Sequence, residues 1–464
     1  MPVAGRKQAP TAIEKETATV TSTLSGREWE LPGMWNRMFE PRVLSTYTAT
    51  GFAALAALPG GESLEYCYGC GKCVPVCPVD VVGEYGPRKL HRKVQTGVDL
   101  FSADDLWLCT TCANCLRVCP KQVNLVEVMP AAREVAVGAG HVPRELQDVF
   151  EKSFRYGNAL GENPRRRHAW TRGAGVPVRV LPNDPSPVDV LFYVEDYWSF
   201  HPRGQEAAQA FVRLLTLAGV DFAILGPEEK TLGDSQRLAG ERGLFEVLME
   251  DVVATLAKYD FARIVTPDPH GLNALRKEYP KRGHTYETLH YTQLLAPLVD
   301  RLPLTVPLDA KVTFHDPCYL GRHNGEYEAP RTLLRAIPGL ELVEMGRCRE
   351  NGYCCGGGGG GMWLDSFTGN HTSERLSERR VREAAATGAD ILAVCCPYEV
   401  SRFSDAAKST GNEHLQVLDI AELLDRATGG ATGTSEQPSR AAGGGEAGSP
   451  GPASSIERAN EDGA

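Results

Sequence analysis

The sequence lacks any long apolar run. No stretch reaches the ~18 consecutive apolar residues that a membrane-spanning helix needs, and the apolar segment 49–59 is far too short. The N-terminal residues also lack the basic segment, apolar run and small-residue cleavage site of an export signal. We therefore expect a cytoplasmic protein with no membrane span of its own, in which cysteines stay reduced.

An excess of positive charge is absent as well. The 464 residues carry a formal net charge of -10, whereas phosphate recognition needs a concentrated basic face, so the composition argues against a nucleic-acid binder. One compact basic run, Arg165–His168, lies in a stretch rich in proline, arginine and asparagine. We interpret this run as solvated linker; a docking patch for an acidic partner is the alternative.

Cysteine is missing between Cys119 and Cys318, although the chain contains 14 cysteines. Eight of them precede this gap in two copies of the pattern CxxCxxCxxxCP. Three closely spaced thiolates can reach three corners of a [4Fe-4S] cubane from one loop, while the fourth, set apart by a proline turn, reaches the other cluster. The expected ligand sets are Cys67, Cys70, Cys73 with Cys119, and Cys109, Cys112, Cys115 with Cys77. Structural zinc prefers pairs of CxxC, and disulfides need an oxidising compartment, so two [4Fe-4S] clusters are the favoured interpretation.

The order of predicted elements indicates an α+β multidomain protein. We expect an N-terminal arm over 1–60, a mostly helical two-cluster ferredoxin-type domain over 61–156 with helices at 124–137 and 144–156, a linker over 157–187, two α/β halves over 188–300 and 301–426, and a disordered tail over 427–464. The tail is dominated by small and polar residues that bury too little surface to offset the entropy of ordering.

The two α/β halves repeat one order of elements. The first has predicted strands at 188–194, 222–225 and 261–266 with helices at 205–218 and 238–259; the second has strands at 311–315, 340–344 and 389–394 with helices at 331–336 and 373–387. Alternation of this kind predicts parallel sheets with functional groups at the strand carboxyl ends, arranged here as one pseudo-two-fold domain.

The halves differ in the residues at these strand ends. Alignment of the motifs places Thr231, Leu232 and Gly233 against Cys354, Cys355 and Gly356, and Asp268 near Cys396. We therefore interpret the first half as a scaffold without a metal site and expect a third metal site in the second half.

The second half resembles a known family. Cys318 in HDPCYLGR, the sequence Cys354-Cys355-Gly356, and Cys396-Pro397 are similar to the cysteine-rich CCG domain of heterodisulfide reductase subunits. The same domain occurs in the iron-sulfur subunits of glycolate oxidase, anaerobic glycerol-phosphate dehydrogenase and lactate-utilisation complexes. With the paired ferredoxin loops, the resemblance covers about residues 60–425 and implies a third iron-sulfur cluster, either cubane or noncubane.

One position departs from the family pattern. The last cysteine of CPxC is replaced by Glu399, and an additional thiol, Cys395, precedes the motif. The remaining metal ligands expected from the resemblance are Cys318, Cys354, Cys355 and Cys396, with Cys395 or Glu399 as a fifth or substitute ligand. Because adjacent residues at a strand end point in opposite directions, we favour Cys396 as the ligand and place Cys395 in the core. We interpret Cys348, in a charged loop, as a bystander thiol.

A run of glycines follows the proposed ligands Cys354 and Cys355. Glycine loops bind phosphates in many proteins, but we favour a role for the amides of Gly356, Gly357 and Gly358 as hydrogen-bond donors to cluster sulfurs. A flexible loop without function is the alternative. His315 and Asp316 are interpreted either as proton-handling groups beside the cluster or, more simply, as structural groups, and His270 has the same two interpretations.

These features predict an electron-transfer subunit of an oxidoreductase. No flavin or nicotinamide fingerprint follows a predicted strand, so the flavin is expected on a partner. The resemblance implies a flavoprotein dehydrogenase or electron-transfer flavoprotein as that partner and a quinone or another acceptor, with peripheral placement at the inner face of the membrane through a quinone-reducing subunit. Thiol-disulfide reduction at the third cluster is the alternative activity, and an assembly scaffold with structural clusters is a third.

Overall fold

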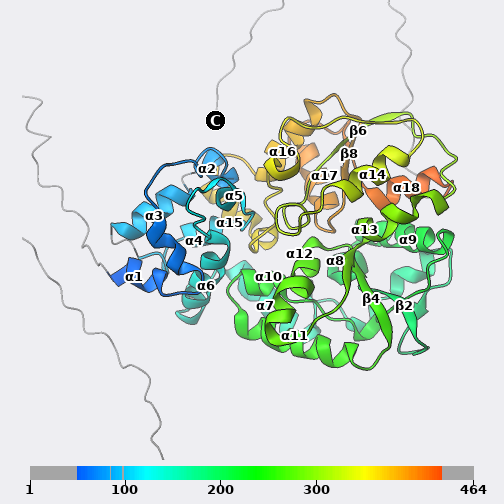
Figure 1. Ribbon diagram of the computed structural model, residues 1–464, viewed down its shortest axis with the longest axis horizontal. Helices are drawn as coiled ribbons and strands as arrows, with labels where there is room; N and C mark the ends of the chain where they lie inside the picture. Colours follow the sequence, from blue (N-terminus) through cyan, green and yellow to red (C-terminus); the bar gives the residue numbers. More distant parts are fainter. Residues whose placement is uncertain (1–49, 84, 97–98, 431–464) are drawn as a thin grey trace, which may run out of the picture. The chain divides into compact units, whose positions relative to one another are not determined.

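The computed structural model describes residues 50–83, 85–96 and 99–430 (Figure 1). Most of the arm expected over 1–60 and the tail from residue 431 onward lie outside the described residues. Among the described residues, no helix is both long enough and apolar enough to cross a membrane.

The first part of the described chain is helical, as predicted. It comprises α1 (Thr50–Ala56), η2 (Gly61–Tyr66), α2 (Pro78–Val82), α3 (Pro87–Gln95), α4 (Asp105–Leu108), α5 (Asn114–Val118), α6 (Leu125–Gly138) and α7 (Arg144–Tyr156). Helix α7 buries Leu146, Val149 and Phe150, which share one face at helical spacing, and it ends where Gly157 adopts a φ of 68°. The helices expected at 124–137 and 144–156 are therefore confirmed.

The first α/β half forms a five-stranded parallel sheet in the order β1-β3-β2-β4-β5. Its strands are β1 (Arg179–Val180), β2 (Val188–Phe192), β3 (Phe222–Ile224), β4 (Phe261–Thr266) and β5 (Thr288–His290). Its helices are α8 (Glu195–Phe200), α9 (Pro202–Leu217), η5 (Gly226–Glu228), α10 (Asp234–Leu238), α11 (Arg242–Leu256), α12 (Pro269–Asn273), η6 (Ala274–Glu278), η7 (Tyr279–Arg282), α13 (Tyr291–Leu295) and η8 (Ala296–Arg301).

The second half forms a four-stranded parallel sheet in the order β7-β6-β8-β9. Its strands are β6 (Ala310–Phe314), β7 (Leu340–Leu342), β8 (Ile391–Val394) and β9 (Gln416–Asp419), and its helices are α14 (Glu328–Ala336), η9 (Arg349–Asn351), η10 (Gly361–Trp363), α15 (Asp365–His371), α16 (Leu376–Ala385), α17 (Glu399–Ser409) and α18 (Ile420–Ala427). The order matches β3-β2-β4-β5 of the first half. The repeat is thus visible in topology, with β1 as an additional edge strand.

The fourth strand of each repeat, β5 or β9, was not anticipated from the sequence. Both are short, and both end in a polar residue, His290 or Asp419, which caps the helix that follows. The His290 ring accepts a hydrogen bond from the Thr292 amide and the Asp419 carboxylate accepts one from the Ala421 amide.

One hydrophobic core joins the two halves. It combines Phe192 and Phe211 of the first half with Phe314, Leu334 and Ala393 of the second, all at most 1% exposed. Tyr291 adds a hydrogen bond between the halves, because its hydroxyl donates to Asp419 Oδ1 at 2.7 Å. Parallel strands buried on both faces need this continuous apolar content, and the two halves therefore form one unit.

The segment predicted as a linker, 157–187, contributes to the first half. It contains η3 (Pro164–Arg166), η4 (Ala169–Gly173) and β1, which pairs with β3. Arg165 and Arg166 are exposed, but the expectation of a solvated run is wrong for Arg167, whose side chain is 2% exposed. Its guanidinium lies 2.6 Å from Asp196 and 3.0 Å from Glu229, so a buried ion pair anchors the segment.

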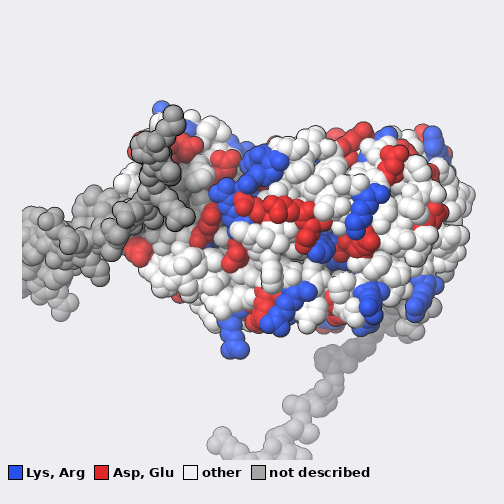
Figure 2. All heavy atoms as spheres, turned by 90° about the horizontal axis from the view of Figure 1, so that it is seen from below, with Lys and Arg blue, Asp and Glu red and all other residues white. Residues whose placement is uncertain are grey.

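Charges of both signs are interspersed on the face of the molecule shown in Figure 2. Lys230 pairs with Asp251 and Lys258 with Glu228, each with partly exposed side chains.

One buried arginine connects the helical part to both α/β halves. Arg133 on α6 donates to the carbonyl oxygens of Leu106 and Cys109 near its own helices, at 3.0 and 2.6 Å. It also donates at 2.8 Å to the carbonyls of Leu238 in the first half and Gly359 in the second. Because its side chain is fully buried, these four hydrogen bonds hold the cysteine loops against the glycine run.

Candidate iron-sulfur sites

The first expected cysteine set surrounds one cavity. Cys67 follows η2, and Cys119 follows α5; together with the other two members, Cys70 and Cys73, they line the same space. Gly69 and Gly71 have φ values of 76° and 78°, a backbone conformation that side chains rarely adopt, and they allow the loop to fold back on itself. Cys70 is exposed, so this set reaches the protein surface.

The second expected set surrounds a separate cavity. The structure brings Cys109, Cys112 and Cys115 together with Cys77, which precedes Pro78 at the first turn of α2. Burial raises the pKa of the Cys77 thiol to about 12. Four thiols around one buried space fit an iron-sulfur cluster, because thiolates are its usual ligands and the metal charge compensates for their burial.

Cys115 lines both cavities, so the two cysteine sets are direct neighbours. Each set combines three cysteines of one loop with the fourth cysteine of the other loop. The fold thereby links the two loops through both cavities.

The third group of thiols lies at the carboxyl ends of neighbouring strands in the second half. Cys318 follows β6, Cys396 follows β8, and Cys354 and Cys355 lie in the loop after η9. The thiols of Cys112, Cys318 and Cys355 hydrogen-bond to Cys354 and hold its pKa well below the ordinary range. Cys112 belongs to the second ferredoxin-type set, so the third group directly adjoins that set.

The first two glycines of the run donate hydrogen bonds to these thiols. The Gly356 amide donates to Cys354 Sγ at 3.3 Å, and the Gly357 amide donates to Cys355 Sγ at 3.5 Å. Gly358 has a different role, since a Cβ atom there would lie 2.4 Å from the Thr110 carbonyl oxygen. Two of the three glycines therefore present amides to sulfur, and the third permits close approach of the ferredoxin-type loop.

Cys396, Cys395 and Cys348 lie in three different environments. Cys396 is buried, and the neighbouring charges of Glu399 and Asp268 add to burial in raising its pKa. Cys395 is fully buried in the core shared by the two halves, as expected. Cys348 is half-buried at the start of η9.

Arg322, in the HDPCYLGR motif, lies between the second and third thiol groups. Its Nε donates to the Cys112 carbonyl at 2.6 Å and its Nη1 to the Gly352 carbonyl at 2.8 Å, while Nη2 is buried without a hydrogen-bond partner among the described residues. Burial disfavours the charged guanidinium, but the charges of Cys112, Cys318 and Cys354 outweigh it, so the pKa of Arg322 is raised. In the sequence, Arg322 is noticeable only as the last residue of the HDPCYLGR motif.

His315 and Asp316 have defined structural partners. The Asp316 carboxylate accepts hydrogen bonds from Arg331 Nη1 at 2.7 Å and from the Arg349 amide at 2.7 Å. His315 Nδ1 accepts a hydrogen bond from Arg380 Nε at 3.0 Å, and burial followed by the Arg380 charge lowers the pKa of His315. His315 also lies 3.2 Å from Glu399, a carboxyl whose pKa burial and the Cys354 charge raise.

The first half presents other groups at its strand ends. Thr231 and Leu232 are buried, and Asp268 Oδ1 accepts the His270 amide at 2.9 Å at the start of α12. The His270 ring stacks on Tyr319 of the second half with centroids 3.8 Å apart, and Tyr319 stacks in turn on His323 at 3.9 Å. His270 is therefore part of the contact between the halves.

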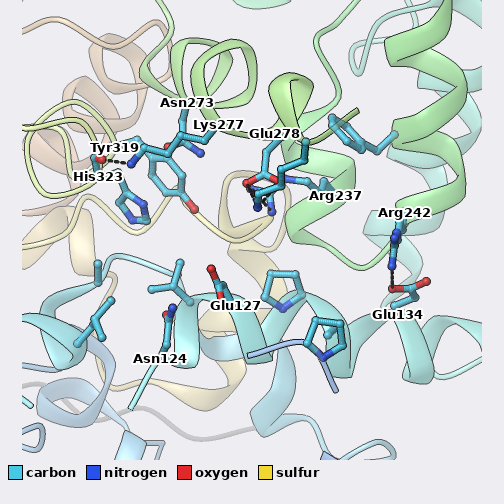
Figure 3. A pocket seen from close by; sticks show the side chains of 18 of the residues that line it. Asn124, Glu127, Glu134, Arg237, Arg242, Asn273, Lys277, Glu278, Tyr319 and His323 are labelled. Carbon is cyan, nitrogen blue, oxygen red and sulfur yellow. Dashed lines mark hydrogen bonds and ion pairs between the residues drawn. The ribbon is translucent and has the colours of Figure 1, made fainter. Parts of the chain in front are cut away.

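An open cleft of about 760 Å³ reaches this aromatic stack (Figure 3). Figure 3 shows Glu127 and Glu134 of α6 facing residues of the first half across the cleft, and Arg242 lies 3.9 Å from Glu134. Lys277 donates a hydrogen bond to the His323 carbonyl at its inner side. The cleft leads from the protein surface to Tyr319, the residue after Cys318.

Two family models match the chain. A 4Fe-4S dicluster domain matches residues 63–123, and the cysteine-rich domain CCG matches residues 312–398. These matches cover the two ferredoxin-type loops and the third thiol group. They support iron-sulfur clusters as the cofactors of the chain.

Several curated proteins are similar over most of the described chain. A subunit of the dihydromethanophenazine:CoB–CoM heterodisulfide reductase of Methanosarcina barkeri is 31% identical over 404 residues, which cover 79% of this chain and 94% of that protein. The probable iron-sulfur-binding oxidoreductase FadF of Bacillus subtilis is 37% identical over 341 residues, 72% of this chain and 48% of the relative. The EtfAB:quinone oxidoreductase of Syntrophomonas wolfei is 34% identical over 338 residues, 71% and 47% of the respective chains.

The chain spans about half the length of the latter two relatives but nearly all of the heterodisulfide reductase protein. It shares with these proteins the oxidoreductase class and the iron-sulfur motifs, which support electron transfer through clusters. The chain therefore belongs to the family of iron-sulfur oxidoreductases that includes this heterodisulfide reductase protein.

Proposed function

We propose that the chain passes electrons between a flavoprotein partner and a quinone or other acceptor through three iron-sulfur clusters. Cys67, Cys70, Cys73 and Cys119 would hold the first, Cys77, Cys109, Cys112 and Cys115 the second, and Cys318, Cys354, Cys355 and Cys396 the third. When bound, such clusters take up and release single electrons. The protein's own contribution is to place the three groups in a row.

The observation that carries this proposal is the continuous series of thiols from the surface to the interior. Cys70 is exposed, Cys115 lines both ferredoxin-type cavities, and Cys112 hydrogen-bonds to the fully buried Cys354. Electrons move efficiently only between closely spaced centres. A series with one exposed end and one buried end suits a protein that accepts electrons from a large partner and delivers them to an enclosed site.

The exposed end offers a surface for the flavoprotein. Tyr66 and Tyr68 flank Cys67 and are 60% and 63% exposed. Exposed aromatic side chains are enriched at protein interfaces. Replacing both by alanine should slow reduction of the chain by an electron-transfer flavoprotein in stopped-flow measurements. Phe154→Ala, at an aromatic residue of α7 that is 70% exposed, is the control. Equal rates in the double variant and wild type would exclude this surface.

Iron and sulfide quantification with EPR on anaerobically purified protein tests the cluster arrangement. Three [4Fe-4S] clusters require about twelve irons per chain, and a flavoprotein donor should reduce all three. About eight irons in fully folded protein would contradict the third cluster. Full iron content with no reduction by any flavoprotein would contradict the electron-transfer role and leave a structural one.

Thiol-disulfide reduction is the second candidate function. The hydrogen bonds that lower the pKa of Cys354 favour a reactive thiolate, and a relative is named as part of a heterodisulfide reductase. The first half contains no cysteine, so one such site at most is present. Turnover of a heterodisulfide by the isolated chain with a reduced dye as electron donor would favour this activity over simple transfer.

A further inference from the structure

Three side chains with metal-ligating atoms converge beside the third thiol group. His315 follows β6, Cys355 belongs to the CC pair, and Glu399 is the first residue of α17. One ligand atom from each lies within 4.8 Å of those of the other two, and both His315 and Glu399 are 1% exposed. Glu399 occupies the position where the CPxC pattern has its last cysteine.

The imidazole of His315 lies beside this carboxyl. Because Nδ1 accepts a hydrogen bond from Arg380 at 3.0 Å, the proton of the neutral ring is on Nε2, which lies 3.2 Å from Glu399 Oε1 but makes no hydrogen bond with any described residue. Arg380 is itself held by the Arg347 carbonyl at 2.8 Å and Glu383 at 2.9 Å. A protonated Nε2 does not bind a metal, so His315 acts as the positioning residue and Glu399 as the candidate ligand.

The second oxygen of Glu399 has no hydrogen-bond partner within the described protein. Oε2 is buried and makes no hydrogen bond with any described residue. A buried carboxyl oxygen without a partner is unfavourable, and a bound water, ion or ligand would satisfy it. The Cys355 sulfur, a proposed cluster ligand, is the neighbouring metal-ligating atom.

We propose that Glu399 binds one iron of the third cluster through Oε2 as a fifth protein ligand, at the position of the missing thiolate, while His315, held by Arg380, lies beside its other oxygen. This inference rests on the proposed third cluster. A carboxylate is a harder ligand than a thiolate, so the iron it holds differs electronically from its all-sulfur neighbours. The third cluster thus has one distinguishable iron site.

Mössbauer and EPR spectroscopy on anaerobically purified variants test the assignment. Glu399→Gln removes the anionic ligand, and Glu399→Cys supplies the thiolate of the full pattern. Glu344→Gln, a carboxyl that pairs with Arg331 and is not a proposed ligand, is the matched control. The two ferredoxin-type signals serve as the folding check. We expect one atypical iron site in wild type and in Glu344→Gln, its conversion to an all-sulfur site in Glu399→Cys, and loss or alteration of the third signal alone in Glu399→Gln.

Identical third-cluster spectra in wild type, Glu399→Gln and Glu399→Cys, at unchanged iron content, would overturn the ligand assignment while leaving the third cluster in place. About eight irons and no third signal in wild type would overturn both proposals. A His315→Gln variant adds a graded readout: as a positioning change it should shift the third signal without abolishing it. An unshifted signal in that variant would contradict the orienting role.

Discussion

The two α/β halves have the same strand order but use their strand ends differently. In the second half, the ends of β6 and β8 and the adjoining loop carry thiols; in the first half, the equivalent positions carry Thr231, Leu232 and Asp268. The first half also buries the carboxylates of Asp196 and Glu229 around Arg167. One fold can therefore hold either a group of thiols or a structural ion-pair network at the strand ends of its sheet.

The sharpest way to test this comparison is to remove a thiol from the second half. Cys354→Ser deletes the sulfur on which Cys112, Cys318 and Cys355 converge, and a serine hydroxyl is a poor ligand for iron-sulfur clusters. We expect the loss of about four of about twelve irons, with the two ferredoxin-type EPR signals retained.

The matched control acts on the first half. The double variant Thr231→Ser, Leu232→Val changes the positions aligned with the cysteine pair by small volumes, and it should retain the wild-type iron content. A loss of about four irons in this variant, or none in Cys354→Ser, would reverse the roles assigned to the two halves.

The largest effect expected on the stability of the first half comes from Arg167→Ala. It would leave the buried carboxylates of Asp196 and Glu229 without their cation, which costs roughly 3–5 kcal/mol of unfolding free energy. Chemical denaturation under anaerobic conditions measures this cost. Arg165→Ala, on an exposed side chain of the same run, should change the stability by less than about 0.5 kcal/mol.

The free energy of unfolding should also depend on pH because of a buried carboxyl in the first half. Burial raises the pKa of Glu229 from 4.5 to about 7, so between these values the folded state binds more protons than the unfolded state. The contribution of Glu229 to the free energy of unfolding is therefore largest below pH 4.5 and decreases as the pH rises towards 7. The decrease is at most roughly 1.4 kcal/mol per pH unit. Asp419 in the second half, whose pKa is also raised by burial to about 7, adds a decrease of the same sign.

Glu229→Gln tests the contribution of this carboxyl. The unfolding free energy of the variant should depend less on pH between 4.5 and 7 than that of wild type, because one of the carboxyls with a raised pKa is gone. An unchanged pH profile in Glu229→Gln would show that Glu229 is ionised throughout this range by its pairing with Arg167.

The smallest effect concerns the charge beside the thiols of the second half. Arg322→Gln removes the cation that lies near Cys112, Cys318 and Cys354, and a nearby positive charge stabilises the reduced form of a cluster. The reduction potentials of the second and third clusters should decrease by about 60 mV, equivalent to a tenfold change in a one-electron equilibrium. Redox titration followed by EPR measures the shift.

The first cluster and a distant arginine provide the controls for Arg322→Gln. The cluster expected at Cys67, Cys70, Cys73 and Cys119 should keep its potential, because none of these residues is among the charges that affect Arg322. Arg335→Gln on α14, whose side chain is exposed, should leave all potentials unchanged. An equal shift of all three clusters would indicate a general structural change.

Local spacing in the sequence determined the cysteine loops and most of the secondary structure. Cysteines separated by two residues face one space because a tight loop leaves few other arrangements, and helix α7 follows directly from its apolar spacing and the terminal Gly157. The repeated order of strands and helices likewise predicted two parallel sheets. Among the strands, β1, β5 and β9 were not recognised, and several helices, including α8, α17 and α18, were not predicted either.

Tertiary structure alone decided how these parts meet. The contact of Cys112 with Cys354, the position of Arg322 between two thiol groups and the approach of His315 to Glu399 all join segments far apart in the sequence. The burial of Arg167 is of the same kind, since its carboxylate partners come from other elements. Such contacts depend on which surfaces pack together and lose water, and no local pattern of residues encodes that outcome.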